Sequence, residues 1–152
     1  MDLNTTLMEM DGIASRTLSA VDKSFMFRGL ATLIDHLFVS AARDIKVINT
    51  AGAHKIRRNI LSLQQTLRGI ISTDAEGMLL RATAFWGLFE LGPKKMLASI
   101  DTTHPMFSFD DYNAMLALQC KQDPEDKESS ELNAYLIDLH AVAMQVDDWD
   151  MM

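Results

Sequence analysis

Two apolar stripes in residues 25–71 constrain the fold more than any other feature of the chain. Between residues 25 and 51, large apolar side chains return every three or four positions, the spacing that places them on one face of an α-helix. The same spacing continues from Ile56 to Ile70. Gly52 lies between the two stretches, where a helix end favours a residue that tolerates positive φ. We therefore predict two long helices that fold back on each other at Gly52.

Two helices with one apolar face each need further helices to cover those faces. Helical spacing recurs along most of the remaining chain, and no stretch alternates as a strand would. Gly92 and Pro93 should end one helix, because proline has no backbone N–H. Ser108 and Asp111 have the spacing of a capping box that opens another. The sequence predicts an all-α fold, an antiparallel helical bundle of about five to six helices.

We expect three segments along the chain. Residues 1–120 form the helical bundle, residues 121–130 an acidic flexible loop, and residues 131–152 an amphipathic helix with a short acidic tail. The loop is predicted from the string KQDPEDKESS, which has no large apolar side chain and contains a proline. At 152 residues the chain is long enough to bury a core without metal or disulfide support.

The charge of the chain is uneven. Residues 1–100 carry 12 basic and 9 acidic side chains, whereas residues 101–152 carry 2 and 12, and the whole chain has a net charge of −7. This balance repels phosphate backbones, so we expect no nucleic-acid partner. A single cysteine, no secretory signal in MDLNTT and no apolar run long enough to span a membrane predict a cytoplasmic protein.

The residue types that usually carry catalysis do not converge here. His36, His54, His104 and His140 fall on separate predicted elements without the spacing of a zinc site. Cys120 follows apolar residues and precedes acidic ones, which should raise the pKa of its thiol. Adjacent carboxylates on a helix point in different directions, and the chain has no phosphate-binding glycine motif. We predict no enzyme activity, no cofactor, no metal and no small-molecule substrate.

The first interaction candidate is a basic group around the predicted turn at Gly52, opposed by Asp44 alone. An acidic protein surface or anionic lipid headgroups could bind it, each basic residue near such a membrane contributing about 1 kcal/mol. The alternative is a solvated helix end without a partner. The basic group consists of Arg43, Lys46, Lys55, Arg57 and Arg58.

The second candidate is an apolar stripe on the last predicted helix. The stripe could pack on the bundle of its own chain or enter a groove of another chain, as amphipathic helices do. The C-terminal stripe consists of Leu132, Leu136, Leu139, Ala143 and Val146.

Several strings in the chain resemble a known family. RGLATLIDHLF at residues 28–38 and RRNILSLQQTL at residues 57–67 are similar to the C-terminal region of the exocyst subunits numbered eight in the Sec series, also called exocyst component four. FWGLFEL and FSFDDYNAMLAL extend the resemblance over most of residues 13–120. The interruption at Gly92 and Pro93 departs from the family pattern, and residues 121–152 match none of it.

This resemblance implies a function that the composition does not reveal. Exocyst subunits are rods of stacked helical bundles that hold secretory vesicles at the plasma membrane before fusion. The chain would then be a small C-terminal part of such a subunit, without enzyme activity or cofactor. It would act in exocytosis by packing against other exocyst subunits, in the cytoplasm and peripherally at plasma-membrane sites of secretion. The alternative function is peripheral binding of anionic lipid through the basic group.

Overall fold

The computed structural model of the chain describes residues 2–71, 77–121 and 130–146. These ranges contain seven α-helices, a short 3-10 helix and no strand, which confirms the predicted all-α fold. The elements are α1 (Leu3–Thr17), α2 (Ala20–Ser40), η1 (Ala41–Arg43), α3 (Thr50–Ile71), α4 (Leu80–Leu91), α5 (Pro93–Ala98), α6 (Phe109–Cys120) and α7 (Ser130–Ala143).

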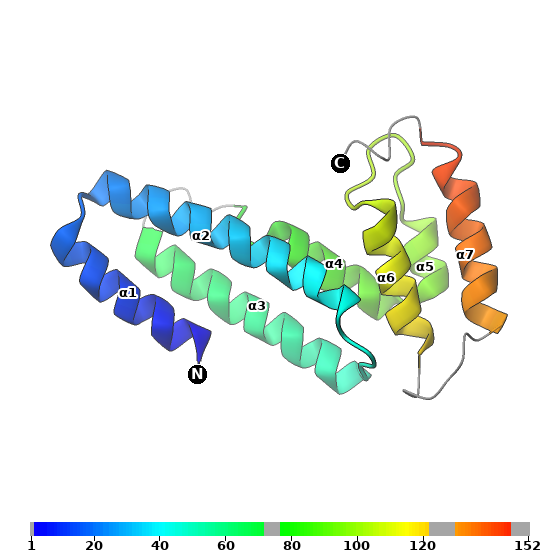
Figure 1. Ribbon diagram of the computed structural model, residues 1–152, viewed down its shortest axis with the longest axis horizontal. Helices are drawn as coiled ribbons and strands as arrows, with labels where there is room; N and C mark the ends of the chain where they lie inside the picture. Colours follow the sequence, from blue (N-terminus) through cyan, green and yellow to red (C-terminus); the bar gives the residue numbers. More distant parts are fainter. Residues whose placement is uncertain (1, 72–76, 122–129, 147–152) are drawn as a thin grey trace.

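The helices form a long bundle with a second group of helices at one end (Figure 1). α1, α2 and α3 run antiparallel to their neighbours in the chain, and α4 packs against both α2 and α3. α5, α6 and α7 gather where α2 ends and α3 begins, opposite the turn between α1 and α2. α6 contacts η1 and α7, so it connects the long bundle to the last helix.

The turn predicted at Gly52 is wrong. The chain reverses over the non-helical residues 44–49, and α3 already begins at Thr50, which places Gly52 inside its first turn. The backbone N–H of Gly52 donates to Oδ1 of Asn49 at 2.8 Å, so Asn49 caps the helix. A Cβ on Gly52 would lie 2.9 Å from Cγ1 of Ile48. The glycine is therefore needed for a close approach of the connector, and not for positive φ.

The predicted interruption and capping box are both confirmed. Gly92 has a φ of +81°, and Pro93 begins α5 directly after it. The Oγ of Ser108 accepts a hydrogen bond from the backbone N–H of Asp111, and the Asp111 carboxylate accepts one from the N–H of Ser108. These local signals act through neighbouring backbone atoms, which is why the sequence alone reveals them.

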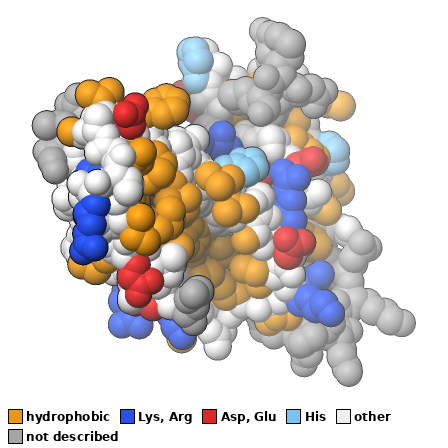
Figure 2. All heavy atoms as spheres, turned by 60° about the vertical axis from the view of Figure 1, so that its left-hand side comes forward, with side chains coloured by type: hydrophobic (Ala, Val, Ile, Leu, Met, Phe, Trp, Pro, Cys, Tyr) orange, Lys and Arg blue, Asp and Glu red, His pale blue; other side chains and the backbone are white. Residues whose placement is uncertain are grey.

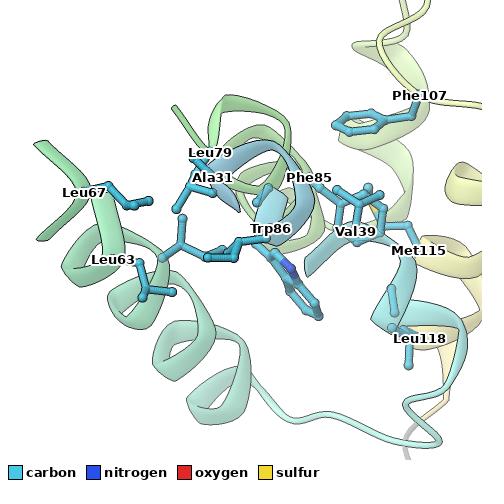
Figure 3. Close-up of a cluster of buried hydrophobic side chains, with 14 of the residues drawn as sticks. Ala31, Val39, Leu63, Leu67, Leu79, Phe85, Trp86, Phe107, Met115 and Leu118 are labelled. Carbon is cyan, nitrogen blue, oxygen red and sulfur yellow. The ribbon is translucent and has the colours of Figure 1, made fainter. Parts of the chain in front are cut away.

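One continuous apolar core joins the long bundle to the helices at its end (Figure 3). Phe85 and Trp86 of α4 are fully buried at its centre, and the Nε1–H of Trp86 donates to the carbonyl of Phe38 at 3.1 Å. The Phe85 ring meets the Phe107 ring edge to face at a centroid distance of 5.5 Å. Phe107 in turn contacts Tyr112 of α6. This row of aromatic rings carries the core from α4 into α6.

The predicted acidic loop lies largely outside the described residues, since 122–129 are not among them. α7 begins at Ser130 and ends at Ala143. Leu132 and Leu139 of this helix belong to the same buried cluster as Trp86. The last helix is thus part of the core of this chain.

Candidate interaction site

Two members of the predicted basic group form ion pairs within the molecule. Nη2 of Arg43 lies 2.8 Å from Oδ1 of Asp111, and Arg57 pairs with Glu90. Lys46, Lys55 and Arg58 are exposed and form no ion pair with any residue in the described ranges. Two of the five positive charges are therefore engaged within the molecule, which weakens the group as a binding site for anions.

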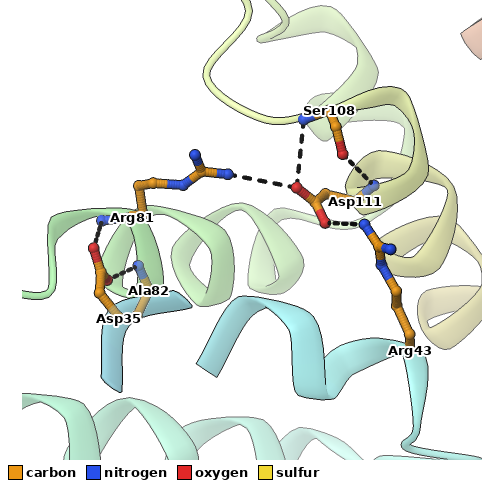
Figure 4. Close-up of polar contacts among 6 residues, drawn as sticks. All are labelled: Asp35, Arg43, Arg81, Ala82, Ser108 and Asp111. Carbon is orange, nitrogen blue, oxygen red and sulfur yellow. Dashed lines mark hydrogen bonds and ion pairs between the residues drawn. The ribbon is translucent and has the colours of Figure 1, made fainter. Parts of the chain in front are cut away.

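Asp111 is the centre of the most connected polar cluster (Figure 4). Its side chain is 9% exposed, and it is held by Arg43 of η1 and by Arg81 of α4, whose Nη2 lies 3.5 Å away. The Arg81 guanidinium also lies 5.4 Å from the centre of the Phe107 ring. Since the Asp111 carboxylate also caps α6, it joins three elements at the point where the long bundle meets the end helices. Arg43 therefore helps to hold α6 against the end of the long bundle.

A second carboxylate, Asp35 of α2, supports the start of α4 (Figure 4). Its Oδ1 accepts from the backbone N–H of Ala82 at 2.7 Å, and its Oδ2 lies 3.4 Å from the N–H of Arg81. Leu79 precedes the helix with a φ of +56° and provides no side-chain cap. The sequence analysis missed this role of Asp35. The available signal was a carboxylate in the mainly apolar string LIDHLF.

A groove of about 560 Å³ lies between the 44–49 connector, the junction of α4 with α5, and the end of α6. Glu90 lines this groove. Nδ1 of His54 lies 3.0 Å from Oε1 of Glu90, which is within ion-pair distance, but the two atoms do not have the geometry of a hydrogen bond. Gln119 donates from Nε2 to the carbonyl of Phe89 at 2.8 Å. Arg57 and His54 both face the Glu90 carboxylate, so this acidic group of the groove is already paired.

The C-terminal stripe faces its own chain. Leu132 and Leu139 are buried, and Leu136, Ala143 and Val146 are partly buried against the core. α7 packs on α6 and α5. Binding of another chain through these five residues stays a prediction, and it would require α7 to leave this position.

The surroundings of Cys120 are those that the sequence predicted to raise the pKa of its thiol. Burial raises the pKa of the Cys120 thiol, and the negative charge of Glu131 raises it further. A thiol with a raised pKa is a poor nucleophile at neutral pH. In residues 2–71, 77–121 and 130–146, no three His, Cys, Asp or Glu side chains lie together as metal ligands would.

One segment, Ala20–Arg43, is long and apolar enough to cross a membrane, judged by length and composition alone. The expectation from the sequence that no apolar run is long enough to span a membrane is therefore wrong by this criterion. Core helices of soluble proteins meet the same criterion. In the structure Phe27, Ala31 and Ile34 of this helix are buried against the rest of the bundle, while its opposite face is exposed.

Sequence comparison identifies relatives of the chain. Over 119 residues, 78% of the chain, it is 30% identical to exocyst complex component 4 of Drosophila melanogaster. The chain is related in sequence to exocyst complex component 4. It is also 32% identical over 98 residues to the probable exocyst complex component sec8 of Neurospora crassa, and 34% identical over 71 residues to exocyst complex component 4 of Dictyostelium discoideum. These two matches cover 64% and 47% of the chain.

The chain corresponds to a small share of these exocyst component 4 proteins. It spans 12% of the Drosophila protein, 8% of the Neurospora protein and 6% of the Dictyostelium protein. No protein-family profile matches the chain, and no solved structure matches it. The resemblance to exocyst component four drawn from strings such as RRNILSLQQTL is confirmed by these matches.

Proposed function

We propose that this chain is a helical unit of an exocyst-type vesicle tether that acts in exocytosis by packing against other subunits of the complex. The observation that carries the proposal is the sequence relation to exocyst complex component 4 over 78% of the chain. The chain works in the cytoplasm, peripherally at plasma-membrane sites of secretion, and it catalyses no reaction.

The all-helical architecture supports this proposal. Helical bundles bind one another by packing apolar ridges into grooves, without a cofactor or a catalytic group. The acidic side chains that bridge helices, Asp111, Asp35 and Glu90, are engaged inside the chain. What the molecule offers to a partner is therefore mainly helix surface.

Binding to purified exocyst subunits tests the proposal. The tagged chain is immobilised and incubated with each of the other subunits in turn, after circular dichroism has verified its helicity. We expect at least one subunit to be retained in stoichiometric amount, and retention to persist at raised salt because apolar packing is little screened. If a folded chain retains none of the subunits, the proposal is wrong.

Anionic lipid binding through the basic group is the alternative function. Among the described residues, Lys46, Lys55 and Arg58 are the members of this group that have no ion pair, so the structure does not favour this function. Flotation with neutral and with anionic vesicles separates the two functions. We expect equal recovery with both vesicles. Higher recovery with anionic vesicles, lost in a Lys55→Glu, Arg58→Glu variant, would instead support the lipid alternative.

A further inference from the structure

The outer face of α2 carries an apolar ridge that no part of the described chain covers. Its members follow each other at intervals of four, and such rows form the ridges with which helices pack into the grooves of other helices. Phe25 is 82% exposed and Val21 is 78% exposed, which is far more than an apolar side chain in a covered position would be. The α2 ridge consists of Val21, Phe25, Gly29, Leu33 and Leu37.

The α2 ridge is long and free of charge. From residue 21 to residue 37 it extends for about 24 Å, the length of a helix of ordinary size. Three charged side chains of α2 are engaged away from the ridge: Lys23 pairs with Asp11 at 2.9 Å, Asp35 caps α4, and Arg28 also has an interaction partner. The fourth, Asp22, lies in the first turn and accepts a hydrogen bond from the Ser19 hydroxyl at 2.6 Å. A surface that covers this ridge must itself be uncharged, because a charge buried against it would find no partner.

Gly29 gives the ridge a notch at its middle. A Cβ added at Gly29 would have no atom within 4 Å, so the space above this residue is open. The side chains of Phe25 and Leu33 stand on either side of it, four residues away. Such a depression between two large side chains receives a side chain of a facing helix. Figure 2, in which the left-hand side of Figure 1 comes forward, shows hydrophobic side chains gathered on the face turned toward the viewer, with charged side chains around them.

A membrane is a poorer match for this face than a protein helix. Helices that lie on membranes carry Lys and Arg beside their apolar face, where they reach the headgroups. Lys23 and Arg28 are the two basic residues of α2, and neither is a free flanking charge. Asp22, exposed at the start of the ridge, would face anionic headgroups unfavourably.

We infer that the α2 ridge is the surface through which this chain binds another subunit of the complex, and that the subunit contributes a helix with an uncharged, apolar face. This inference rests on the proposed function and adds the surface and the chemistry of the partner. The relatives of this chain are named as components of a complex, which accounts for an apolar face left open in the single chain.

Cysteine labelling tests the inference in the assembled complex. In a Cys120→Ser background, Leu33→Cys places a thiol on the α2 ridge, and Leu61→Cys places a control thiol on α3. The two leucines are matched, since they are 53% and 48% exposed. We expect maleimide to modify the residue-33 thiol at least about tenfold more slowly in the purified complex than in the isolated chain, as burial in an interface core requires. The control thiol should react at similar rates in both.

A photoreactive maleimide at the same ridge position identifies the neighbour. We expect it to crosslink to an apolar helical segment of another subunit. Equal modification rates in chain and complex, or crosslinks to phospholipid or to a second copy of this chain, would overturn the inference while leaving the proposed function intact. A chain that never enters the complex would overturn both.

Discussion

Asp111, Asp35 and Glu90 each bind a group from a helix other than their own. Asp111 of α6 receives Arg43 and Arg81, and the other two carboxylates connect α2 with α4 and α4 with α3. From the sequence, Asp111 was predicted to be part of a capping box, and Arg43 and Arg57 were candidates for binding a partner. The sequence does not reveal these pairs, because they join residues 30 or more positions apart.

Replacement of Asp111 by alanine should destabilise the protein. Two half-exposed arginines would lose their partner and α6 its reciprocal cap, so we expect the free energy of unfolding to fall by about 2 kcal/mol. Urea denaturation followed by circular dichroism measures the change. Asp110→Ala is the matched control, since Asp110 is exposed beside it and should change stability by less than about 0.5 kcal/mol. Equal losses of stability in the two variants would show that the Asp111 ion pairs do not stabilise the fold.

Tyr112 should make stability depend on pH in the alkaline range. Burial raises the pKa of Tyr112 above its ordinary value of 10.0, and the charge of Asp111 adds to this. The unfolded chain therefore releases the phenol proton first. The contribution of protonated Tyr112 to stability is complete below pH 10.0. It is lost as the pH rises toward the higher pKa of Tyr112 in the folded state.

Urea midpoints measured at increasing pH check this expectation. The midpoint of the wild-type chain should fall more steeply above pH 10.0 than that of Tyr112→Phe, which has no phenol to ionise at this position. Parallel curves for the two proteins would show that Tyr112 does not titrate differently on folding.

At the scale of elements, the 44–49 connector is the main departure from the predicted structure. Its sequence, DIKVIN, continues the apolar spacing of the preceding helix, which is why the pattern predicted helix up to Gly52. β-Branched residues lose side-chain freedom in a helix, and Asn49 bonds to the backbone of the next helix instead. Apolar spacing marks residues that can face the core, but such residues need not belong to a helix. Ile45 and Ile48 of the connector pack against the core as well.

Two glycines of α3 should respond in opposite ways to alanine. A Cβ at Gly69 would have no atom within 4 Å, so Gly69→Ala should stabilise the protein by about 0.7 kcal/mol through the lower entropy of the unfolded chain. A Cβ at Gly52 would lie 2.9 Å from Ile48, and we expect Gly52→Ala to give no gain or a loss. Thermal unfolding of both variants measures the difference. Equal stabilisation would contradict the close approach of the connector.

At the scale of the whole molecule, nearly all buried apolar residues form one cluster that extends from Leu7 of α1 to Leu139 of α7. A single core favours one cooperative unfolding transition, even though the ribbon shows two groups of helices. Trp86 reports on the centre of this core, because it is buried in α4 and its indole donates to the carbonyl of Phe38.

Truncation of a buried side chain in the last helix should therefore lower the stability of the whole molecule. Leu139→Ala should lower the free energy of unfolding by about 3 kcal/mol, because it leaves a cavity in the core. Trp86 fluorescence, recorded in a Trp149→Phe background, and far-UV circular dichroism should shift together. Ile137→Ala, on the exposed side of α7, serves as the control and should change neither. Separate transitions by the two probes would show that α7 unfolds independently.

The sequence by itself determined the fold class, the break at Gly92 and Pro93, and the capping box at Ser108 and Asp111. It also carried the relation to the exocyst, through strings such as RRNILSLQQTL. Each of these rests on a periodic pattern or on residues a few positions apart, which a linear reading resolves.

The partners of the charges and the exposure of each face emerged only from the folded chain. The sequence gives no sign that Arg43 pairs with Asp111, which lies beside it in the structure. The C-terminal stripe packs against the core, whereas the α2 ridge is exposed. Both outcomes depend on which helices lie side by side. Apolar spacing marks a face that can be buried, but only packing in three dimensions determines whether a neighbour covers it.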